Sequence, residues 1–314
     1  MFAMPGLLAF ILATQLMRGV GDTITPLYAL LISTAVSCVL TPAFIQGWFG
    51  LPRLGVTSAA AASILAFVAA LCFMAWYMRR NGHPLSPDLE LLRALRIDPS
   101  LLRLVVKIGL PTGMQVIVMS LSEIVLLSLV NGFGADATAA YGAVNQVVNY
   151  VQFPAISIAI TASILGAQAI GAGRVGQLDA ITRTGLQMNI VMTGGLVVLG
   201  YLLSRVLISA FITSAPVVEL AQSLLHIMLW SSVVYGCAAV LSGVMRASGA
   251  VLVPTGIAIF CIAAIELPAA YVLAGLFGLE GVWMAYPIAF VAMLVLQSTY
   301  YLGVWRKRKI VRLV

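Results

Sequence analysis

The decapeptide MRGVGDTITP (residues 17–26) recurs in altered form as MRASGAVLVP (residues 245–254), with Met, Arg, Gly and Pro at the same four positions. The two copies are 228 residues apart, and the Phe-Gly-Leu tripeptides at 49–51 and 277–279 share that offset. Self-similarity at a fixed offset indicates two related structural units in one chain. A chance match between two glycine-rich apolar segments is the alternative. With a slippage of up to two residues the match continues through Pro42 and Pro268, Gly55 and Val56 with Gly281 and Val282, and Arg79 and Arg80 with Arg306 and Lys307.

Both copies lie between long apolar runs, and the composition of the chain indicates what those runs do. Of the 314 residues, 62% are hydrophobic and 9% are charged, and the mean hydropathy is +1.08. A water-soluble domain carries roughly 25% charged residues, so we expect the lipid bilayer to be the solvent. The net charge of +7 does not indicate a nucleic-acid partner, because the basic residues are dispersed between apolar runs and form no patch.

The apolar runs predict an all-α polytopic membrane protein with about nine transmembrane helices. Each helix needs about 20 predominantly apolar residues, and the runs cover approximately residues 2–17, 24–46, 54–78, 107–131, 139–169, 186–212, 220–243, 252–276 and 281–305. Only the connection over residues 79–106 is long. It is predicted to be a polar loop with a short surface helix, whose apolar positions are Leu91, Leu92, Leu95, Leu101, Leu102 and Val105. Bends are expected at Pro111, Pro154, Pro268 and Pro287.

Lysine and arginine are unevenly distributed between the two sides of this topology. Fifteen lie on the side that carries residues 79–106 and the C-terminal tail, and only Arg53 and Arg205 lie on the other. Because cytoplasmic loops are enriched in basic residues, the first side is predicted to be cytoplasmic. We therefore expect a multi-pass protein of the plasma (inner) membrane, with the N-terminus of this chain outside and its C-terminus in the cytoplasm.

The repeat also predicts the domains. The second unit begins near Lys107 and holds six spans, so the first unit should also hold six, of which three are present. We expect three further helices, about 120 residues, before Met1, and twelve spans in the complete protein. The predicted domains are the second half of an N-terminal lobe (1–80), a cytoplasmic inter-lobe loop (81–106), a six-helix C-terminal lobe (107–305) and a basic cytoplasmic tail (306–314).

Metal and cofactor chemistry is not indicated by the sequence. All four cysteines lie inside apolar runs without metal-binding spacing, and His83 and His226 are far apart. The sequence contains no nucleophile paired with a base, no P-loop and no dinucleotide-binding glycine pattern. We therefore expect a protein that is not an enzyme and needs no cofactor, and an ATP-driven pump is excluded for this chain by itself.

Two carboxylates fall within predicted spans, where an ionisable group is costly and usually functional. Glu123 lies 16 residues into the span that begins at Lys107, about 12 Å from its outer end near Asn131 at 1.5 Å per residue. Glu266 lies at similar depth in the span that begins at Leu252. We predict that both belong to an ion- or substrate-binding site. The alternative is a protonated or hydrogen-bonded carboxyl that joins two helices.

The next span carries Asn145, Asn149 and Gln152 at steps of four and three residues, which places three amides on one helical face. A row of amides is costly to expose to lipid, where it finds no hydrogen-bond partners. We predict that it faces Glu123 and supplies oxygen ligands to Na⁺ or donors to a substrate. The alternative is that the amides join neighbouring helices through hydrogen bonds.

Methionine and aromatic side chains are candidates to line an adaptable apolar cavity, since thioethers and aromatic rings accept ligands of many shapes and can face a cation. The candidates are Met119, Tyr150, Phe153 and Tyr235, together with Met114, Met188, Met192 and Trp230. Ordinary core packing is the better explanation for any single one of them.

Several motifs together resemble the multidrug and toxic compound extrusion (MATE) family of efflux transporters. They are MRGVGDTITP at 17–26 with its second copy MRASG at 245–249, KIGLPTG at 107–113, GADATAAYGAVNQV at 134–147 and QAIGAGR at 168–174. The similarity runs through all 314 residues and corresponds to about the last nine of that family's twelve helices. It implies a two-lobe (6+6) antiporter that exports amphipathic, often cationic drugs and toxic organic compounds against inward Na⁺ or H⁺ flow.

The chain departs from the family pattern in three places. The acid of the C-terminal lobe usually lies a turn nearer the proline, where this chain has Met119. The helix at 220–243 has no acid where some members place one. The aspartate of the family's first helix would belong to the preceding segment.

Two other functions are alternatives: a lipid-linked glycan flippase of the same superfamily, and a membrane-embedded enzyme or truncated, inactive fragment. A flippase would need several basic residues for a pyrophosphate, and the predicted spans carry none at mid-membrane, which favours the antiporter. The expected partners are small amphipathic or cationic substrates and the lipid bilayer, without nucleic acid. The oligomeric state is left open, with a monomer expected for the full-length protein.

Overall fold

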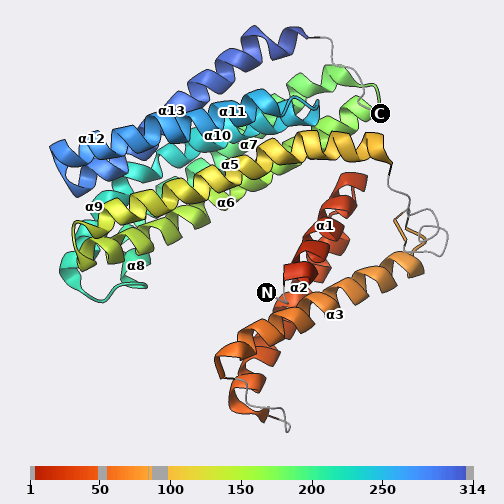
Figure 1. Ribbon diagram of the computed structural model, residues 1–314, viewed down its shortest axis with the longest axis horizontal. Coiled ribbons are helices and arrows are strands. Elements are labelled where there is room, and N and C mark those ends of the chain that lie inside the picture. The colour runs from red at the N-terminus through yellow and green to blue at the C-terminus, as the bar shows by residue number, and fades with distance from the viewer. Residues whose placement is uncertain (1–3, 49–54, 84, 87–97, 309–314) are drawn as a thin grey trace. The chain divides into compact units, whose positions relative to one another are not determined.

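The computed structural model describes residues 4–48, 55–83, 85–86 and 98–308. Within these residues all regular secondary structure is helical, as the sequence predicts (Figure 1). The chain divides into two compact units, Met1–Asp98 and Pro99–Val314.

The first unit consists of α1 (Met4–Val20), α2 (Ile24–Gln46) and α3 (Ser58–Arg80). α3 packs against α1 and α2 through a stripe of alanines at every fourth position, of which Ala62, Ala66 and Ala70 are 0–1% exposed. Small side chains allow helix backbones to approach closely in a membrane. α2 begins at Ile24, two residues after Asp22, whose Oδ1 accepts the N–H groups of Ile24 and Thr25 in the first turn.

The second unit contains the long helices α5 (Pro99–Asn131), α6 (Ala135–Gly171), α7 (Leu178–Leu202) and α13 (Leu279–Gly303). Shorter elements lie between α7 and α13, namely α8 (Ser204–Ser209), α9 (Ala215–Leu229), α10 (Ser231–Ala247), α11 (Leu252–Phe260), the π-helical turn Cys261–Glu266 and α12 (Leu267–Phe277). Gly134 closes the turn between α5 and α6 with a φ of 107°, which a residue with a side chain rarely adopts. The tight turn makes α5 and α6 neighbours in space.

α10 packs against α6, α7 and α13 and is the buried centre of the second unit. Gly243 permits the close approach to α6, because a Cβ there would collide with the backbone carbonyl oxygen of Ala159. On the α7 side, the fully buried Asn189 donates its Nδ2 to the carbonyl oxygen of Val233 at 3.0 Å. The hydroxyl of Thr193 donates to Asn189 Oδ1 at 2.9 Å. A close backbone contact and a buried polar network therefore fix α10.

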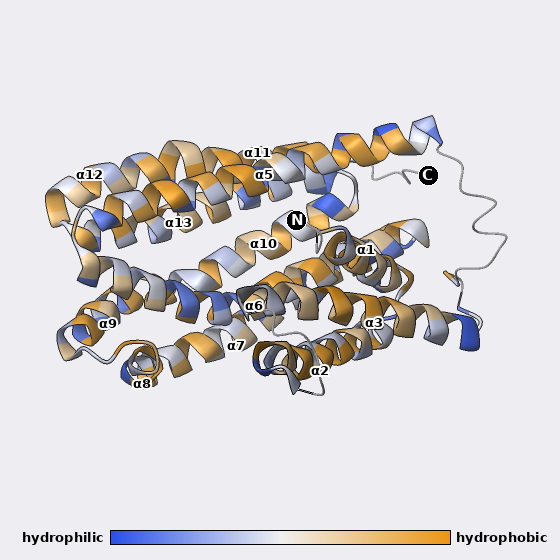
Figure 2. Ribbon diagram, turned by 60° about the horizontal axis from the view of Figure 1, so that its bottom comes forward, coloured by the Kyte–Doolittle hydropathy of each residue, from blue (hydrophilic) through white to orange (hydrophobic). Residues whose placement is uncertain are grey.

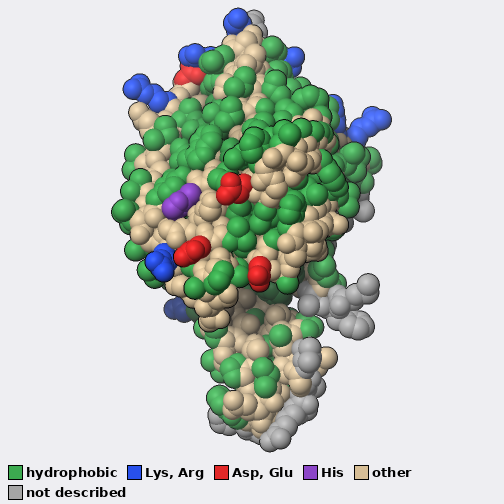
Figure 3. Space-filling model, turned by 90° about the vertical axis from the view of Figure 1, so that its left-hand side faces the viewer, with side chains coloured by type: hydrophobic (Ala, Val, Ile, Leu, Met, Phe, Trp, Pro, Cys, Tyr) green, Lys and Arg blue, Asp and Glu red, His purple; other side chains and the backbone are tan. Residues whose placement is uncertain are grey.

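The outer surfaces of the helices are apolar. In the described part of the chain, eight helical stretches are long and apolar enough to cross a membrane, and α1 is a shorter apolar helix. Much of the helical ribbon has the colour of hydrophobic residues (Figure 2), and a space-filling view of one face shows few charged side chains among the hydrophobic ones (Figure 3). An apolar exterior of this extent suits lipid and not water. The prediction of about nine transmembrane helices is confirmed.

The beginning of α5 differs from the sequence prediction. The helix starts at Pro99 and not at Lys107, so residues 99–106, part of which were predicted to belong to a separate surface helix, continue directly into the membrane-spanning helix. Proline is tolerated in the first turn of a helix, and the following LLRLVVK contains no helix-breaking residue. Residues 87–97, which carry part of the predicted surface helix, lie outside the described residues.

Other boundaries also differ. The span predicted at 186–212 begins earlier, as α7 at Leu178, and ends at Leu202 before the separate α8. The span predicted at 220–243 is divided at Trp230 into α9 and α10. Pro111, Pro154 and Pro287 lie inside uninterrupted helices, whereas the sequence before Pro268 forms the π turn.

Candidate functional site

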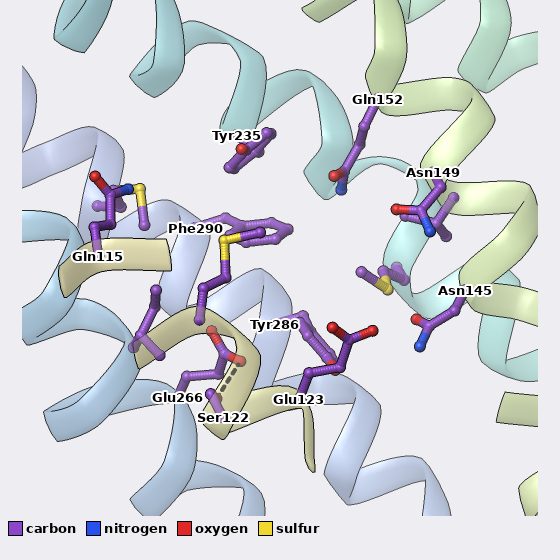
Figure 4. A pocket seen from close by; sticks show the side chains of 15 residues that line it. Gln115, Ser122, Glu123, Asn145, Asn149, Gln152, Tyr235, Glu266, Tyr286 and Phe290 are labelled. Atoms are coloured by element: carbon purple, nitrogen blue, oxygen red, sulfur yellow. Dashed lines mark hydrogen bonds between the residues drawn. The ribbon is translucent and has the colours of Figure 1, made fainter. Parts of the chain in front are cut away.

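A cavity of about 170 Å³ lies within the second unit (Figure 4). We call it the acidic cavity. Six structural elements supply its lining, and residues far apart in sequence meet there. The lining residues are Gln115, Met119, Ser122 and Glu123 of α5; Asn145, Val148, Asn149 and Gln152 of α6; Met228 of α9; Tyr235 of α10; Ile262 and Glu266 of the π turn; and Tyr286, Phe290 and Met293 of α13.

The two carboxylates of the cavity have different environments. Glu266 is 6% exposed, and its Oε1 accepts a hydrogen bond from the Ser122 hydroxyl at 3.3 Å. Glu123 is exposed to the cavity and makes no hydrogen bond to any residue that the structure describes. Glu123 is therefore the carboxylate available to a ligand, whereas Glu266 is held by the protein.

The local sequence explains how Glu266 reaches the cavity. Pro268 has no N–H group to donate and crowds the preceding turn of an ordinary α-helix. The chain widens into a π turn, in which the N–H of Leu267 donates to the carbonyl oxygen of Ile262, five residues earlier. Single π turns of this kind are common at functional sites. The extra residue in the turn sets the direction of the Glu266 side chain.

The amide row of α6 faces Glu123. Asn145, Asn149 and Gln152 point into the cavity from α6, while Glu123 enters it from α5 (Figure 4). Asn149 and Gln152 make no hydrogen bond within the described residues, so their amides are available to a ligand. Carboxylate and amide oxygens together are suitable ligands for a dehydrated Na⁺ ion.

Aromatic rings form another wall of the cavity. The rings of Tyr235 and Phe290 have centroids 5.0 Å apart, and those of Tyr286 and Phe290 are 6.3 Å apart. The hydroxyl groups of Tyr141 and Tyr286 form a hydrogen bond of 3.1 Å. Packed rings of this kind present a rigid face that attracts organic cations.

Gln115 closes one end of the cavity. Its Oε1 accepts a hydrogen bond of 2.8 Å from Arg246 Nη2, which connects α5 with α10. Gln115 precedes Glu123 by eight residues, so this contact lies about 12 Å from Glu123 along the helix axis. The guanidinium group of Arg246 thus holds Gln115 in place without lining the cavity itself.

The structure brings together most of the residues that the sequence singles out. Glu123, Glu266, the amide row, Met119 and Tyr235 all line the acidic cavity. Tyr150 and Phe153 do not; they are 55% and 56% exposed and contact each other edge-on at 6.0 Å. They follow Asn149 and Gln152 directly, and each step of one residue turns a helix by about 100°. Their side chains therefore point away from the face that carries the amide row. The other candidates, Met114, Met188, Met192 and Trp230, also lie outside the lining.

Sequence reasoning missed the contribution of α13. Tyr286 and Phe290 are four residues apart on one face of this helix, a spacing that indicates a shared wall. Ser122 was also missed, although it precedes Glu123 directly. Gln115, Met228, Ile262 and Met293 carried no distinguishing pattern.

Comparison with known proteins places this geometry in context. Residues 111–272 match the MatE family model. The chain is 42% identical over its whole length to the probable multidrug resistance protein YoeA of Bacillus subtilis (strain 168), of which it covers 68%. It is 25% identical over 95% of its length to the probable multidrug resistance protein NorM of Thermotoga maritima, of which it covers 64%.

The fold has been observed before. A mutant of the Vibrio cholerae MATE transporter VcmN superimposes with a TM-score of 0.83 at 19% identity, over 94% of this chain and 65% of that one. An outward-facing MATE transporter gives a TM-score of 0.82 at 20% identity, over 91% of this chain and 63% of that one. The chain thus spans about two thirds of the length of the relatives that it matches.

Proposed function

The chain belongs to the multidrug and toxic compound extrusion (MATE) family, and from that membership we propose that it works as a secondary active efflux transporter of amphipathic and cationic organic compounds. The export is coupled to the inward flow of Na⁺ or H⁺. Relatives named as multidrug resistance and multidrug export proteins support this assignment. Movement of two lobes around the binding region gives alternating access to the two sides of the membrane.

The acidic cavity carries the proposal. An ionisable group inside a membrane protein is costly and usually marks a path for ions or substrate. Here two carboxylates and four side-chain amides converge in an apolar surrounding. This combination suits a ligand that is positively charged and partly apolar.

Glu123 is the proposed exchange site. Its carboxylate binds either the inward-moving ion or an outgoing organic cation, because one unpaired carboxylate neutralises one positive charge. Binding of either ligand weakens the binding of the other by the same factor. Glu266 has a positioning role, since Ser122 already occupies one of its oxygens.

Substrate breadth follows from the walls of the cavity. Met119, Met228 and Met293 are flexible and polarisable, so they adapt to different apolar shapes. The aromatic wall of Tyr235, Tyr286 and Phe290 is rigid and attracts cationic rings. A site with few directional contacts accepts many related compounds.

The composition of the cavity disfavours the flippase alternative. Among the described lining residues there are two acids and no lysine or arginine. A pyrophosphate-bearing lipid would face repulsion there and would find no bidentate arginine.

The proposed topology places the C-terminus in the cytoplasm and the N-terminus of this chain outside, in the plasma (inner) membrane of the cell. The distribution of lysine and arginine supports this orientation. We propose that the full-length protein is a monomer.

The test compares Glu123→Gln with Glu219→Gln. Glutamine is nearly isosteric with glutamate but carries no charge. Glu219 lies in α9, is exposed and does not line the cavity, so it is a matched control in the same unit. The binding of ethidium to the purified chain is measured by fluorescence anisotropy over a series of Na⁺ concentrations and pH values.

We expect wild type and Glu219→Gln to bind ethidium more weakly as Na⁺ or H⁺ increases. Glu123→Gln should lose this ion dependence while retaining its fold by circular dichroism. Unchanged ion dependence in folded Glu123→Gln would show that Glu123 is structural.

A further inference from the structure

A second pocket lies in the second unit between α7 and the C-terminal end of α13, outside the acidic cavity. It has a volume of about 770 Å³. We call it the α7–α13 pocket. The side chains that matter for its chemistry are Asp179, Thr182, Arg183, Ile190, Tyr301 and Arg306.

The pocket carries a positive charge without a counterion. Arg306 Nη2 and Asp179 Oδ2 form an ion pair at 2.8 Å, so their charges cancel. Arg183 is exposed and makes no hydrogen bond or ion pair within the described residues. Lys307 and Arg308, which follow Arg306 directly, are also exposed. The electrostatic balance therefore favours an anion at Arg183.

The floor of the pocket is rigid and aromatic. Tyr301 is 6% exposed, and its hydroxyl group donates to the Thr182 hydroxyl oxygen at 3.1 Å. The ring of Trp305 stacks on Tyr301 with centroids 5.1 Å apart, and its Nε1 donates to the Ser248 hydroxyl at 2.8 Å. Tyrosine and tryptophan are enriched where a membrane protein meets the lipid headgroups. Their position indicates that this pocket lies at the membrane–water interface.

The pocket is polar at one end and apolar at the other. Arg183, Leu186, Gln187 and Ile190 are spaced three, four and seven residues apart and therefore lie on one face of α7. Ile190 is 55% exposed and lies two helical turns, about 10 Å, from Arg183 along the axis. A ligand with an anionic head and an apolar chain matches both ends.

We propose that the α7–α13 pocket is a binding site for an anionic phospholipid. The phosphate group binds Arg183, whose planar guanidinium suits bidentate contact with phosphate oxygens. Arg306 forms the other wall and stays paired with Asp179, and an acyl chain lies along Leu186 and Ile190. Basic pockets between transmembrane helices are typical sites for anionic headgroups.

The apolar end decides between two sources of the phosphate. A soluble phosphate would use Arg183 alone and would gain nothing from Leu186 and Ile190. A phospholipid uses the basic and the apolar ends at once, and it is present at high local concentration in the bilayer. The site is independent of the transport proposal, because it shares no residue with the acidic cavity.

The test measures the binding of lipids to the purified chain in detergent micelles. Dioleoyl phosphatidylglycerol, dioleoyl phosphatidylcholine, glycerophosphoglycerol and inorganic phosphate are added separately, and bound lipid is counted by native mass spectrometry. The variants are Arg183→Gln, Ile190→Gln and the control Arg174→Gln. Arg174 is exposed at the same end of α7 and does not line the pocket.

We expect wild type and Arg174→Gln to bind phosphatidylglycerol in preference to phosphatidylcholine. Arg183→Gln should weaken phosphatidylglycerol binding by about fivefold, the effect of one basic residue near an anionic lipid surface. Ile190→Gln should weaken it as well, although the charge is unchanged.

Three results would overturn the proposal. Equal losses in Arg183→Gln and Arg174→Gln would indicate diffuse surface attraction. Binding of glycerophosphoglycerol or inorganic phosphate at the same concentration as the lipid, and to the same extent, would indicate a site for a soluble anion. Equal binding of the two lipids by the wild type would show that no anion site is present.

Discussion

The replacement Gly243→Ala tests the close contact between α6 and α10 that supports one side of the acidic cavity. The added Cβ would collide with the carbonyl oxygen of Ala159 and lie 3.2 Å from the carbonyl carbon of the same residue. Backbone atoms of a helix cannot move aside as the end of a side chain can. The two helices must therefore separate or α10 must shift.

The expected cost is that of overpacking a closely packed interior, about 1–3 kcal/mol. For a unit of this size, each kcal/mol lowers the melting temperature by about 2–4 °C. The control is Gly195→Ala in α7, where no atom lies within 4 Å of the added Cβ. Since alanine favours a helix by about 0.5–1 kcal/mol over glycine, the control should be neutral or stabilising.

The assay is thermal unfolding of the purified variants in one detergent, followed by tryptophan fluorescence. We expect opposite signs for the two glycine replacements. If Gly243→Ala melts at or above the temperature of the wild type, α6 and α10 do not approach as closely as the structure shows.

Three further predictions concern other parts of the chain. Asn189→Ala should destabilise the second unit by about 1–3 kcal/mol, because Thr193 and a backbone carbonyl lose buried hydrogen bonds; unchanged thermal unfolding would contradict this network. Asp22 caps α2, since its Oδ1 accepts the N–H groups of Ile24 and Thr25 at 3.1 and 3.0 Å. Partial burial by itself would raise the pKa of Asp22, but the hydrogen bonds and the nearby His83 outweigh it, so the pKa lies below its usual 3.8. A lowered pKa in the folded state contributes stability above pH 3.8 that is lost as the pH falls further. Asp22→Ala should lower the free energy of unfolding by about 1 kcal/mol at neutral pH and should remove the loss of stability at low pH. Equal acid unfolding of wild type and Asp22→Ala would contradict the cap. For the topology, a single cysteine at Ser86 in a cysteine-free chain should resist an impermeant thiol reagent in intact cells, and rapid labelling would reverse the orientation.

The sequence was sufficient to predict that the amide row of α6 lies opposite Glu123 of α5, although not the rest of the acidic cavity. Helical spacing places Asn145, Asn149 and Gln152 on one face whatever the tertiary structure is. The tight turn ending at Gly134 then brings that helix back along α5, so Glu123 and the amides meet at similar depth. The meeting of Glu123 with the amide row can therefore be predicted from helical spacing and one tight turn.

Tertiary packing determined what the sequence could not predict. In a membrane protein the side of a helix that faces lipid and the side that faces an apolar cavity have similar composition, so Met188 and Met192 could not be distinguished from true lining residues. Tyr150 and Phe153 could have been excluded, because each lies one residue, about 100° around the helix, from a member of the amide row. Tyr286 and Phe290 reach the cavity through the packing of α13, which no local pattern specifies. Pro268 indicates an irregularity in its helix, but the sequence does not predict that this irregularity takes the form of a π turn.

Ion displacement by a substrate tests most directly the claim that an ion and an organic cation compete for Glu123. The purified chain is equilibrated with radioactive Na⁺, or in a weakly buffered solution with a pH indicator, and ethidium is then added. We predict that each ethidium bound releases one Na⁺ or one proton from wild type and none from Glu123→Gln. Binding of ethidium to the wild type without release of either ion, or equal release from both forms, would contradict competition at this carboxylate.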